Sequence, residues 1–264
     1  MYKFDAAKET KNVKNWIKNW FETESGNAEG VIIGISGGTD STIVAKLCCE
    51  AIGNEKVRGV LMPNKHQSDI SDSYRVCDIL KIKSNEININ GAFLDIIEKI
   101  NSSTLSNPSE QLNEISIINI APRLRMTIIC TLGQTLNYRT AGTGNLSERY
   151  VGYCTKWGID TAHDFNPIAN FTKTEVKQIG DCLGLPHDLV HKIPADGLSG
   201  LSDEENMKIT YDVLDNYIRT QSYEEKDREM IERVIKRNKA AQHKINPIPC
   251  YNFNPYNEKS TIQQ

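Results

Sequence analysis

The sequence predicts an α/β fold, a doubly wound parallel sheet flanked by helices. Residues 31–35 form a short continuous apolar run, which is typical of a strand buried on both faces. Residues 57–62 and a segment near 86–89 predict two more strands, and helical patterns lie between the three. Strands that alternate with helices in this way indicate a parallel sheet joined by right-handed crossovers.

The remaining elements follow from hydrophobic spacing. An amphipathic helix is expected in the first twenty residues, where apolar side chains recur at helical intervals: Val13, Trp16, Ile17, Trp20 and Phe21. Residues 114–137 predict one long helix with a bend at Pro122. Other helices are expected over 42–51, 70–81, 91–100 and near 224–241, and a fourth strand over 138–141.

Composition narrows the class of protein. The 264 residues carry a net charge of −3, which argues against bulk nucleic-acid binding, and their number suits one large domain or two small ones. No apolar run approaches the roughly 20 residues of a membrane helix, so no membrane partner is expected. The polar amino terminus is unlike a secretory signal. Seven scattered cysteines without C-x-x-C spacing indicate reduced thiols and a cytoplasmic protein.

The stretch Ser36-Gly37-Gly38-Thr39-Asp40-Ser41 lies between the first strand and the following helix. Glycines let a backbone approach an anion closely, and the N–H groups of a helix start point at the same place. The stretch therefore predicts a pyrophosphate-binding loop, with an ordinary turn as the alternative. It lacks the Lys and the spacing of a Walker A loop.

Asp40 gives this loop a further property. A carboxylate beside bound triphosphate would be repelled unless a cation lay between them. Mg²⁺ prefers oxygen ligands from phosphate and protein, so Asp40 predicts a Mg²⁺ site.

The loop resembles that of the N-type ATP pyrophosphatases, whose fold is the adenine nucleotide alpha hydrolase type. Six other segments resemble those of one branch, the ammonia-dependent NAD synthetases. They are Pro63 to Asp69, Asn119-Ile-Ala-Pro-Arg123-Leu-Arg125-Met126, Gly142-Thr143-Gly144-Asn145-Leu146-Ser147-Glu148, Cys154 to Asp160, Phe171 to Glu175, and Gln242-His243-Lys244. The resemblance covers about residues 13–245, with the motifs in the order of the family, and it implies one domain spanning 1–264.

The resemblance implies roles for individual residues. Asp40 and Lys173 would be catalytic, and Asp40 and Glu148 would hold the metal. ATP would contact Gly34, Ser36, Gly37, Gly38, Thr39, Ser41, Met62, Gln67 and Thr143. Deamido-NAD would contact Asn119, Arg123, Lys156, Asp160, Asp164, His243 and Lys244.

The resemblance also implies a reaction. The nicotinate carboxylate of deamido-NAD would attack the α-phosphate of ATP, giving an acyl-adenylate and pyrophosphate, and ammonia would then displace AMP to form NAD. No glutaminase domain is expected, so free ammonia would be the nitrogen donor. A homodimer is implied, with the long helix at 114–137 as its dimerisation helix. Alternatives are another acid or a tRNA base as substrate, or a module that binds ATP without turnover.

Three positions leave alternatives open. Asn145 and Glu148 have the spacing of a helix cap, so Glu148 is either a capping residue or a metal ligand. One residue is inserted before Asp160, which makes Asp164 an alternative contact. Ala195 follows Pro194 where the family has Ser or Thr, so Ser199 or Ser202 could substitute.

Overall fold

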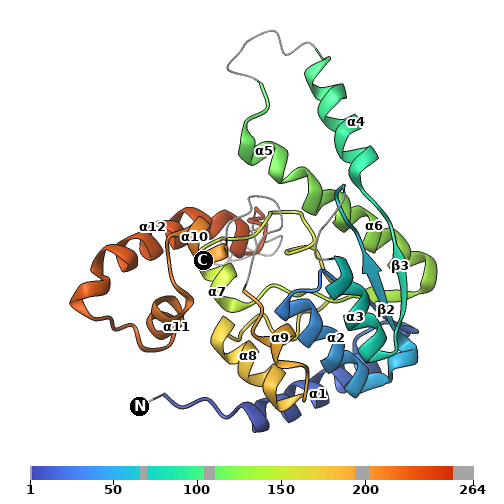
Figure 1. Ribbon diagram of the computed structural model, residues 1–264, viewed down its shortest axis with the longest axis horizontal. Coiled ribbons are helices and arrows are strands. Elements are labelled where there is room, and N and C mark those ends of the chain that lie inside the picture. The colour runs from blue at the N-terminus through green and yellow to red at the C-terminus, as the bar shows by residue number, and fades with distance from the viewer. Residues whose placement is uncertain (1, 66–69, 104–110, 194–201, 252–264) are drawn as a thin grey trace, which may run out of the picture.

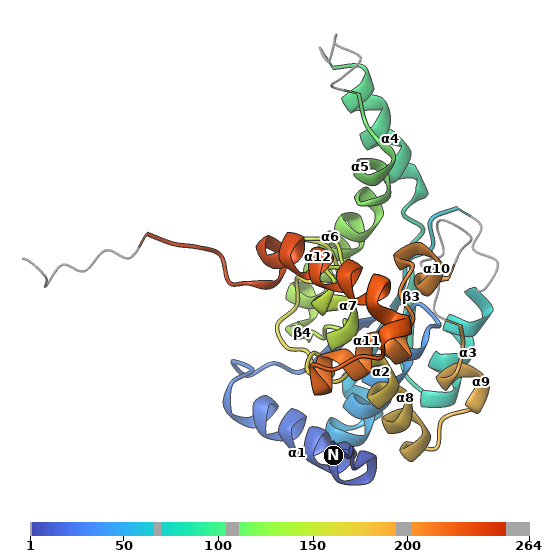
Figure 2. The ribbon, with the colours of Figure 1, turned by 90° about the vertical axis from the view of Figure 1, so that its left-hand side faces the viewer.

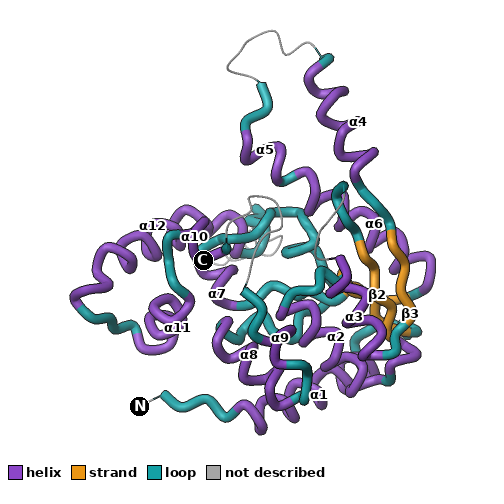
Figure 3. Tube along the Cα trace, viewed as in Figure 1, coloured by secondary structure: helices purple, strands orange, loops and turns teal. Residues whose placement is uncertain are grey.

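The computed structural model describes residues 2–65, 70–103, 111–193 and 202–251. Its sheet has four parallel strands in the order β3-β2-β1-β4, which confirms the predicted class (Figure 3). The strands are β1 (Gly30–Gly34), β2 (Val57–Leu61), β3 (Lys83–Glu86) and β4 (Tyr138–Thr140). The chain runs outward from β1 to β3 and then returns to β4 on the other side of β1. Ligands of open α/β sheets bind where the strand order reverses in this way.

Helices cover both faces of the sheet, and strand β1 is therefore buried on both faces. Val31 and Ile33 pack into one apolar cluster, and Ile32 packs into a second one on the opposite face. The first cluster takes side chains from α1 (Ala6–Thr23), α2 (Thr39–Ile52), α3 (Ile70–Leu80), α8 (Lys173–Cys182) and α9 (His187–Val190). The second takes them from α4 (Asn90–Asn101) and α6 (Ile120–Leu136).

Strand β3 lies three residues earlier than the sequence predicts. It pairs with β2 alone, and its side chains are exposed. An exposed edge position suits its polar sequence, Lys-Ser-Asn-Glu. The apolar residues that suggested 86–89 come after the strand, where Ile87 and Ile89 pack into the second cluster. An edge strand in solvent therefore lacks the apolar signal of a buried one.

The prediction of one long helix over 114–137 is wrong in its continuity. The chain forms α5 (Glu114–Ile118) and α6, which meet at Asn119. Pro122 has no N–H to donate to the carbonyl of residue 118, and its ring crowds that carbonyl. Helices α4 and α5 project together from the body of the molecule (Figures 1 and 2).

The stretch Glu114–Leu136 also departs from the expectation that no apolar run could span a membrane. By length and composition alone it is apolar enough, since 18 of its consecutive residues have a mean hydropathy of 1.4, and 17% of these 18 residues are buried. This is weak evidence, because the helix breaks at Asn119 and carries Arg123 and Arg125 in its middle.

A third apolar cluster joins the carboxyl-terminal helices to α7 (Leu146–Tyr150). These helices are α10 (Asp203–Met207), α11 (Tyr211–Thr220) and α12 (Arg228–Ile245), with single 3₁₀ turns at Asn54–Lys56 and Glu225–Asp227 elsewhere in the chain. Helix α11 packs on α7 and α8, and α12 packs on α7 (Figures 1 and 2). All seven cysteines are free thiols, as the sequence predicts.

Candidate active site

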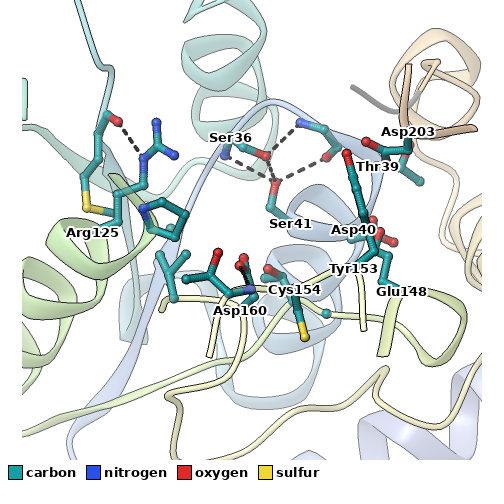
Figure 4. Close-up of a pocket in the computed structure, with 18 of the residues that line it drawn as sticks. Ser36, Thr39, Asp40, Ser41, Arg125, Glu148, Tyr153, Cys154, Asp160 and Asp203 are labelled. Atoms are coloured by element: carbon teal, nitrogen blue, oxygen red, sulfur yellow. Dashed lines mark hydrogen bonds between the residues drawn. The ribbon is translucent and has the colours of Figure 1, made fainter. Parts of the chain in front are cut away.

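A cavity of about 590 Å³ opens at the carboxyl ends of β1 and β2. Figure 4 shows the loop after β1 in its centre, Arg125 of α6 at one side, and Asp40, Glu148 and Asp203 at the other. Three carboxylates therefore gather at one end of the cavity, its acidic end, and Arg125 lies at the other. The position of the cavity is the one that the strand order predicts for a ligand.

The loop at 36–41 is built to approach an anion. Gly37 has φ +74°, and a Cβ there would lie 2.8 Å from Asp72 Cβ and from Ser73 N, so only glycine fits against α3. The hydroxyls of Ser36 and Ser41 lie 3.1 Å apart, and Gly38 N donates to Ser36 Oγ at 3.2 Å. Gly38 begins α2 without a side-chain cap among the described residues, so the helix start remains open to a bound anion.

At the acidic end, Lys173 joins the two predicted metal ligands. Its side chain is 3% exposed, its Nζ is hydrogen-bonded to Asp40, and it lies 3.6 Å from Glu148 Oε1. Burial opposes the charge on Lys173, but Asp40 and Glu148 outweigh it and raise the lysine pKa. Burial and the charge of Asp40 raise the pKa of Glu148 to about 8, although Lys173 opposes that shift. The two carboxylates thus need a cation between them, and here the ammonium supplies it.

The structure separates the two roles considered for Glu148. Asn145 caps α7 by accepting a hydrogen bond from Glu148 N at 3.0 Å, so the cap is present. The Glu148 carboxylate is directed instead to Lys173. A complete capping box forms at Thr172 and Glu175, and it places Lys173 in the first turn of α8.

Asp40 and Glu148 fit a magnesium ion by their chemistry, because both offer hard carboxylate oxygens. No group of three or more His, Cys, Asp or Glu side chains in the described ranges could hold a metal by itself. Two protein carboxylates leave the other coordination positions to phosphate oxygens and water. Asp203, which is 7% exposed, also lines this end of the cavity.

Most of the residues predicted for ATP line the cavity: Gly34, Ser36, Gly38, Thr39, Ser41, Met62 and Thr143. Gly37 packs on α3 beside it. Gln67, Ala195 and Ser199 lie outside the described residues. The hydroxyl of Ser202 is engaged in the capping box of α10 with Glu205, which gives it a structural partner.

The residues predicted for deamido-NAD divide into two groups. Asn119, Asp160 and Lys244 line the cavity, whereas Arg123, Lys156, Asp164 and His243 do not. Of the two alternative acids, Asp160 is the one that lines the cavity, and its carboxylate accepts a hydrogen bond from Thr155 N at 3.2 Å.

Asp164 and Lys244 each tie neighbouring segments of the chain together. Asp164 accepts from the N–H and hydroxyl of Thr140 at 2.7 and 2.9 Å, which fixes the end of β4. Lys244 Nζ donates to the carbonyls of Gly152 and Cys154 at 3.0 and 2.9 Å, which ties α12 to the segment that lines the cavity.

Of the two arginines in the motif at 119–126, only Arg123 was selected as a contact for deamido-NAD, but Arg125 lines the cavity. Its Nε donates to Met62 O at 3.0 Å at the end of β2 (Figure 4), and burial lowers its pKa although Asp160 opposes the shift. Arg123, the residue selected from the sequence, is exposed. The sequence carried a sign that Arg125 faces inward, because it lies four residues from both Ala121 and Ile129. Both of these residues are buried, and the three side chains share one helix face.

The comparisons with known proteins agree with this geometry. The sequence profile of the family described as NAD synthase matches residues 9–248. The chain belongs to the NAD synthase family. Curated relatives of this family member include the NH(3)-dependent NAD(+) synthetase of Thermococcus sibiricus, 40% identical over 219 residues that make up 83% of this chain and 82% of the relative. The protein of the same name from Carboxydothermus hydrogenoformans is 36% identical, over 89% and 93% of the two chains.

Solved structures of the family share its fold, the adenine nucleotide alpha hydrolase type. The NMN synthetase from Francisella tularensis has a TM-score of 0.83 and 28% identity, over 95% of this chain and 100% of that one. A glutamine-dependent NAD+ synthetase from Acinetobacter baumannii has a TM-score of 0.65 and 22% identity. The alignment covers 94% of this chain but 48% of that one.

Proposed function

We propose that this member of the NAD synthase family converts deamido-NAD to NAD, using ATP and ammonia and releasing AMP and pyrophosphate. The observation that carries the proposal is the single cavity that holds the 36–41 loop, Asp40, Glu148 and Lys173 at the switch point of the sheet. The names of the relatives, NH(3)-dependent NAD(+) synthetases, indicate NAD as the product and ammonia as the nitrogen source. Deamido-NAD is the acid from which that product would form.

The proposed reaction has two steps. An oxygen of the nicotinate carboxylate attacks the α-phosphorus, and the bond from that phosphorus to the bridging oxygen breaks, which releases pyrophosphate. The nitrogen of ammonia then attacks the acyl carbon, the bond from that carbon to the phosphate oxygen breaks, and ammonia loses a proton. The products are the amide and AMP.

The chain contributes alignment and charge to both steps. The open amides after Gly38 and the hydroxyls of Ser36 and Ser41 would hold the departing pyrophosphate. Asp40 and Glu148 would hold Mg²⁺, whose charge would offset that of the phosphates. Lys173 keeps these two carboxylates in place and adds a positive charge beside them.

A second substrate is favoured by one observation. The NMN synthetase from Francisella tularensis is named for the mononucleotide. Its fold is more similar to this chain than that of the NAD synthetase from Campylobacter jejuni, with TM-scores of 0.83 and 0.75. Nicotinate mononucleotide carries the same reacting carboxylate as deamido-NAD and lacks the AMP half. Amidation of that mononucleotide is therefore the alternative function.

The two functions are separated by comparing kcat/KM for the two acids with ATP, Mg²⁺ and ammonium held constant. We expect deamido-NAD to exceed nicotinate mononucleotide by at least about tenfold, the ratio that roughly 1.4 kcal/mol of differential binding gives. The reverse preference would replace the proposed substrate by the mononucleotide, with the same chemistry at the same loop.

We also propose that the chain is a homodimer through α5 and α6. Thr127, Thr131 and Thr135 lie one turn apart on the exposed face of α6, and their hydroxyls donate to the carbonyls four residues before them. This leaves their methyl groups to face outward. Ile115 on α5 is 72% exposed. An apolar face of this kind on a scarcely buried helix suits a second copy of the chain. The seven reduced cysteines support a cytoplasmic location.

A further inference from the structure

Glu148 and Lys173 come from two helices that have to be held together. Glu148 lies on α7, a helix of five residues, and Lys173 is the first residue of α8. A helix this short has little stability of its own. The mutual position of the two charged groups therefore depends on contacts outside the two helices.

One carboxylate on a third helix makes those contacts. Asp215 of α11 is 6% exposed and accepts a hydrogen bond from the hydroxyl of Ser147, the residue before Glu148. Its second oxygen accepts from the N–H and hydroxyl of Thr174, the residue after Lys173, at 2.8 and 2.7 Å. One side chain thus joins the neighbours of both functional residues.

Ser147 completes the connection. It is fully buried, and its Oγ accepts a hydrogen bond from Lys173 N at 3.0 Å. Its hydroxyl therefore donates to Asp215 and accepts from the backbone of α8. The negative charge of Asp215 lies against the amino terminus of α8, where the helix dipole favours an anion. Burial raises the pKa of Asp215, while the hydrogen bonds from Ser147 and Thr174 lower it.

We infer that Asp215 is a positioning residue: its carboxylate sets Glu148 against Lys173 and thereby orders the site for Mg²⁺ and phosphate. Asp215 does not line the cavity, so it acts through Ser147 and Thr174 rather than on the substrate. The inference rests on the proposed function, because that function requires Glu148 and Lys173 to lie in a fixed position relative to each other.

The chain offers a matched control on the same pair of helices. Arg219, one turn after Asp215, joins α11 to α8 by donating to Glu175, with Nε to Oε1 at 2.8 Å. That pair lies on the α8–α11 contact, and neither of its side chains is hydrogen-bonded to Ser147 or Thr174. Replacing Arg219 by Ala removes a charged contact between the same helices and leaves the Asp215 hydrogen bonds in place.

The test compares Asp215→Asn, Asp215→Glu and Arg219→Ala with the wild type, at equal folded fraction from circular dichroism. Asn keeps the shape but places an NH₂ group where an oxygen accepts, so one set of donors loses its partner. We expect kcat to fall roughly 10- to 100-fold in Asp215→Asn, as when outer-shell partners of metal ligands are lost, with KM for deamido-NAD within about threefold. The Mg²⁺ concentration for half-maximal rate should rise, and Asp215→Glu should recover part of the rate.

Binding of Mn²⁺ with a non-hydrolysable ATP analogue, followed by paramagnetic resonance, gives a second readout without turnover. Asp215→Asn should weaken it at least about tenfold, and Arg219→Ala should leave it near the wild type. Equal losses in both variants, or an unchanged kcat and Mn²⁺ affinity in Asp215→Asn, would overturn the inference. A wild type that binds Mn²⁺ and the analogue but makes no amide would contradict the proposed function alone.

Discussion

The ammonium of Lys173 is hydrogen-bonded to the carboxylate of Asp40, a residue 133 positions away in the sequence. The contact joins the first turn of α8 to the first turn of α2, the helix that follows the phosphate loop. A lysine in the first turn of a helix is disfavoured by the helix dipole. Its place is explained by the buried carboxylates that it neutralises.

Replacing Lys173 by Met should destabilise the metal-free protein. Two carboxylates would remain in a mostly buried site without a counter-charge, and removal of one partner of a buried pair costs on the order of 3 kcal/mol. Because a divalent cation could replace the lost charge, millimolar Mg²⁺ should raise the melting temperature of this variant more than that of the wild type. Lys177→Met, one turn further along α8, is the control. A variant whose melting temperature ignores both Mg²⁺ and chelator would contradict this reading of the site.

Replacing Arg125 by Ala should weaken ATP binding roughly 10- to 100-fold, the range that hydrogen bonds to a charged group give. Its Nε holds the end of β2 while the rest of the guanidinium lines the cavity. Lys should not rescue the loss, since an ammonium cannot reproduce the planar set of donors. Titration calorimetry with ATP and Mg²⁺ measures the effect, and Arg123→Ala is the matched variant. A larger loss in Arg123→Ala would favour the residue selected from the sequence.

The stability of the protein in acid should depend on Glu175. Burial would raise the pKa of this carboxyl, but hydrogen bonds from Arg219 and Tyr2 outweigh burial and lower it. A folded-state pKa below the unfolded one contributes stability above the unfolded value of about 4.3, and that stability is lost as the pH falls through the folded value. Urea midpoints measured from pH 3 to 7 should therefore fall less steeply at the acid end in Glu175→Gln. If the urea midpoints of Glu175→Gln fell as steeply in acid as those of the wild type, the hydrogen bonds of Glu175 would not determine the acid stability of the protein.

Replacing Thr131 by Arg should convert the proposed dimer to a monomer. The new charge would lie in the middle of the methyl face of α6, where pairing would bury it without a partner. Sedimentation velocity at several protein concentrations measures the effect, with Gln178→Arg on the exposed surface of α8 as control. A wild type that sediments as a monomer would remove the dimer proposal.

The parts of the site that form contiguous motifs could be predicted from the sequence. The loop after β1 is local, so Gly37 and Asp40 have the roles of turn and helix start that their neighbours require. Lys173 and Glu148 were identified by resemblance, and their mutual contact depends on how α7 and α8 pack, which no spacing encodes.

The differences between the sequence analysis and the structure have one origin, tertiary packing. Both arginines of α6 fit the family motif, and Arg125 is the one that lies on the buried face of the helix and lines the cavity. Asp164 was an alternative to Asp160 until the hydrogen bonds to Thr140 showed that it holds the end of β4. The edge strand β3 was displaced in the prediction because solvent, rather than a core, receives its side chains.

AMP formation with components left out one at a time tests the central claim most directly. With ATP, Mg²⁺, ammonium and deamido-NAD together, we predict AMP, pyrophosphate and NAD in equal amounts, and AMP near background when deamido-NAD is omitted. Asp40→Asn should fold normally and release almost no pyrophosphate, because it loses the carboxylate at the loop. AMP formed without an acid substrate, or unchanged turnover in Asp40→Asn, would contradict the account.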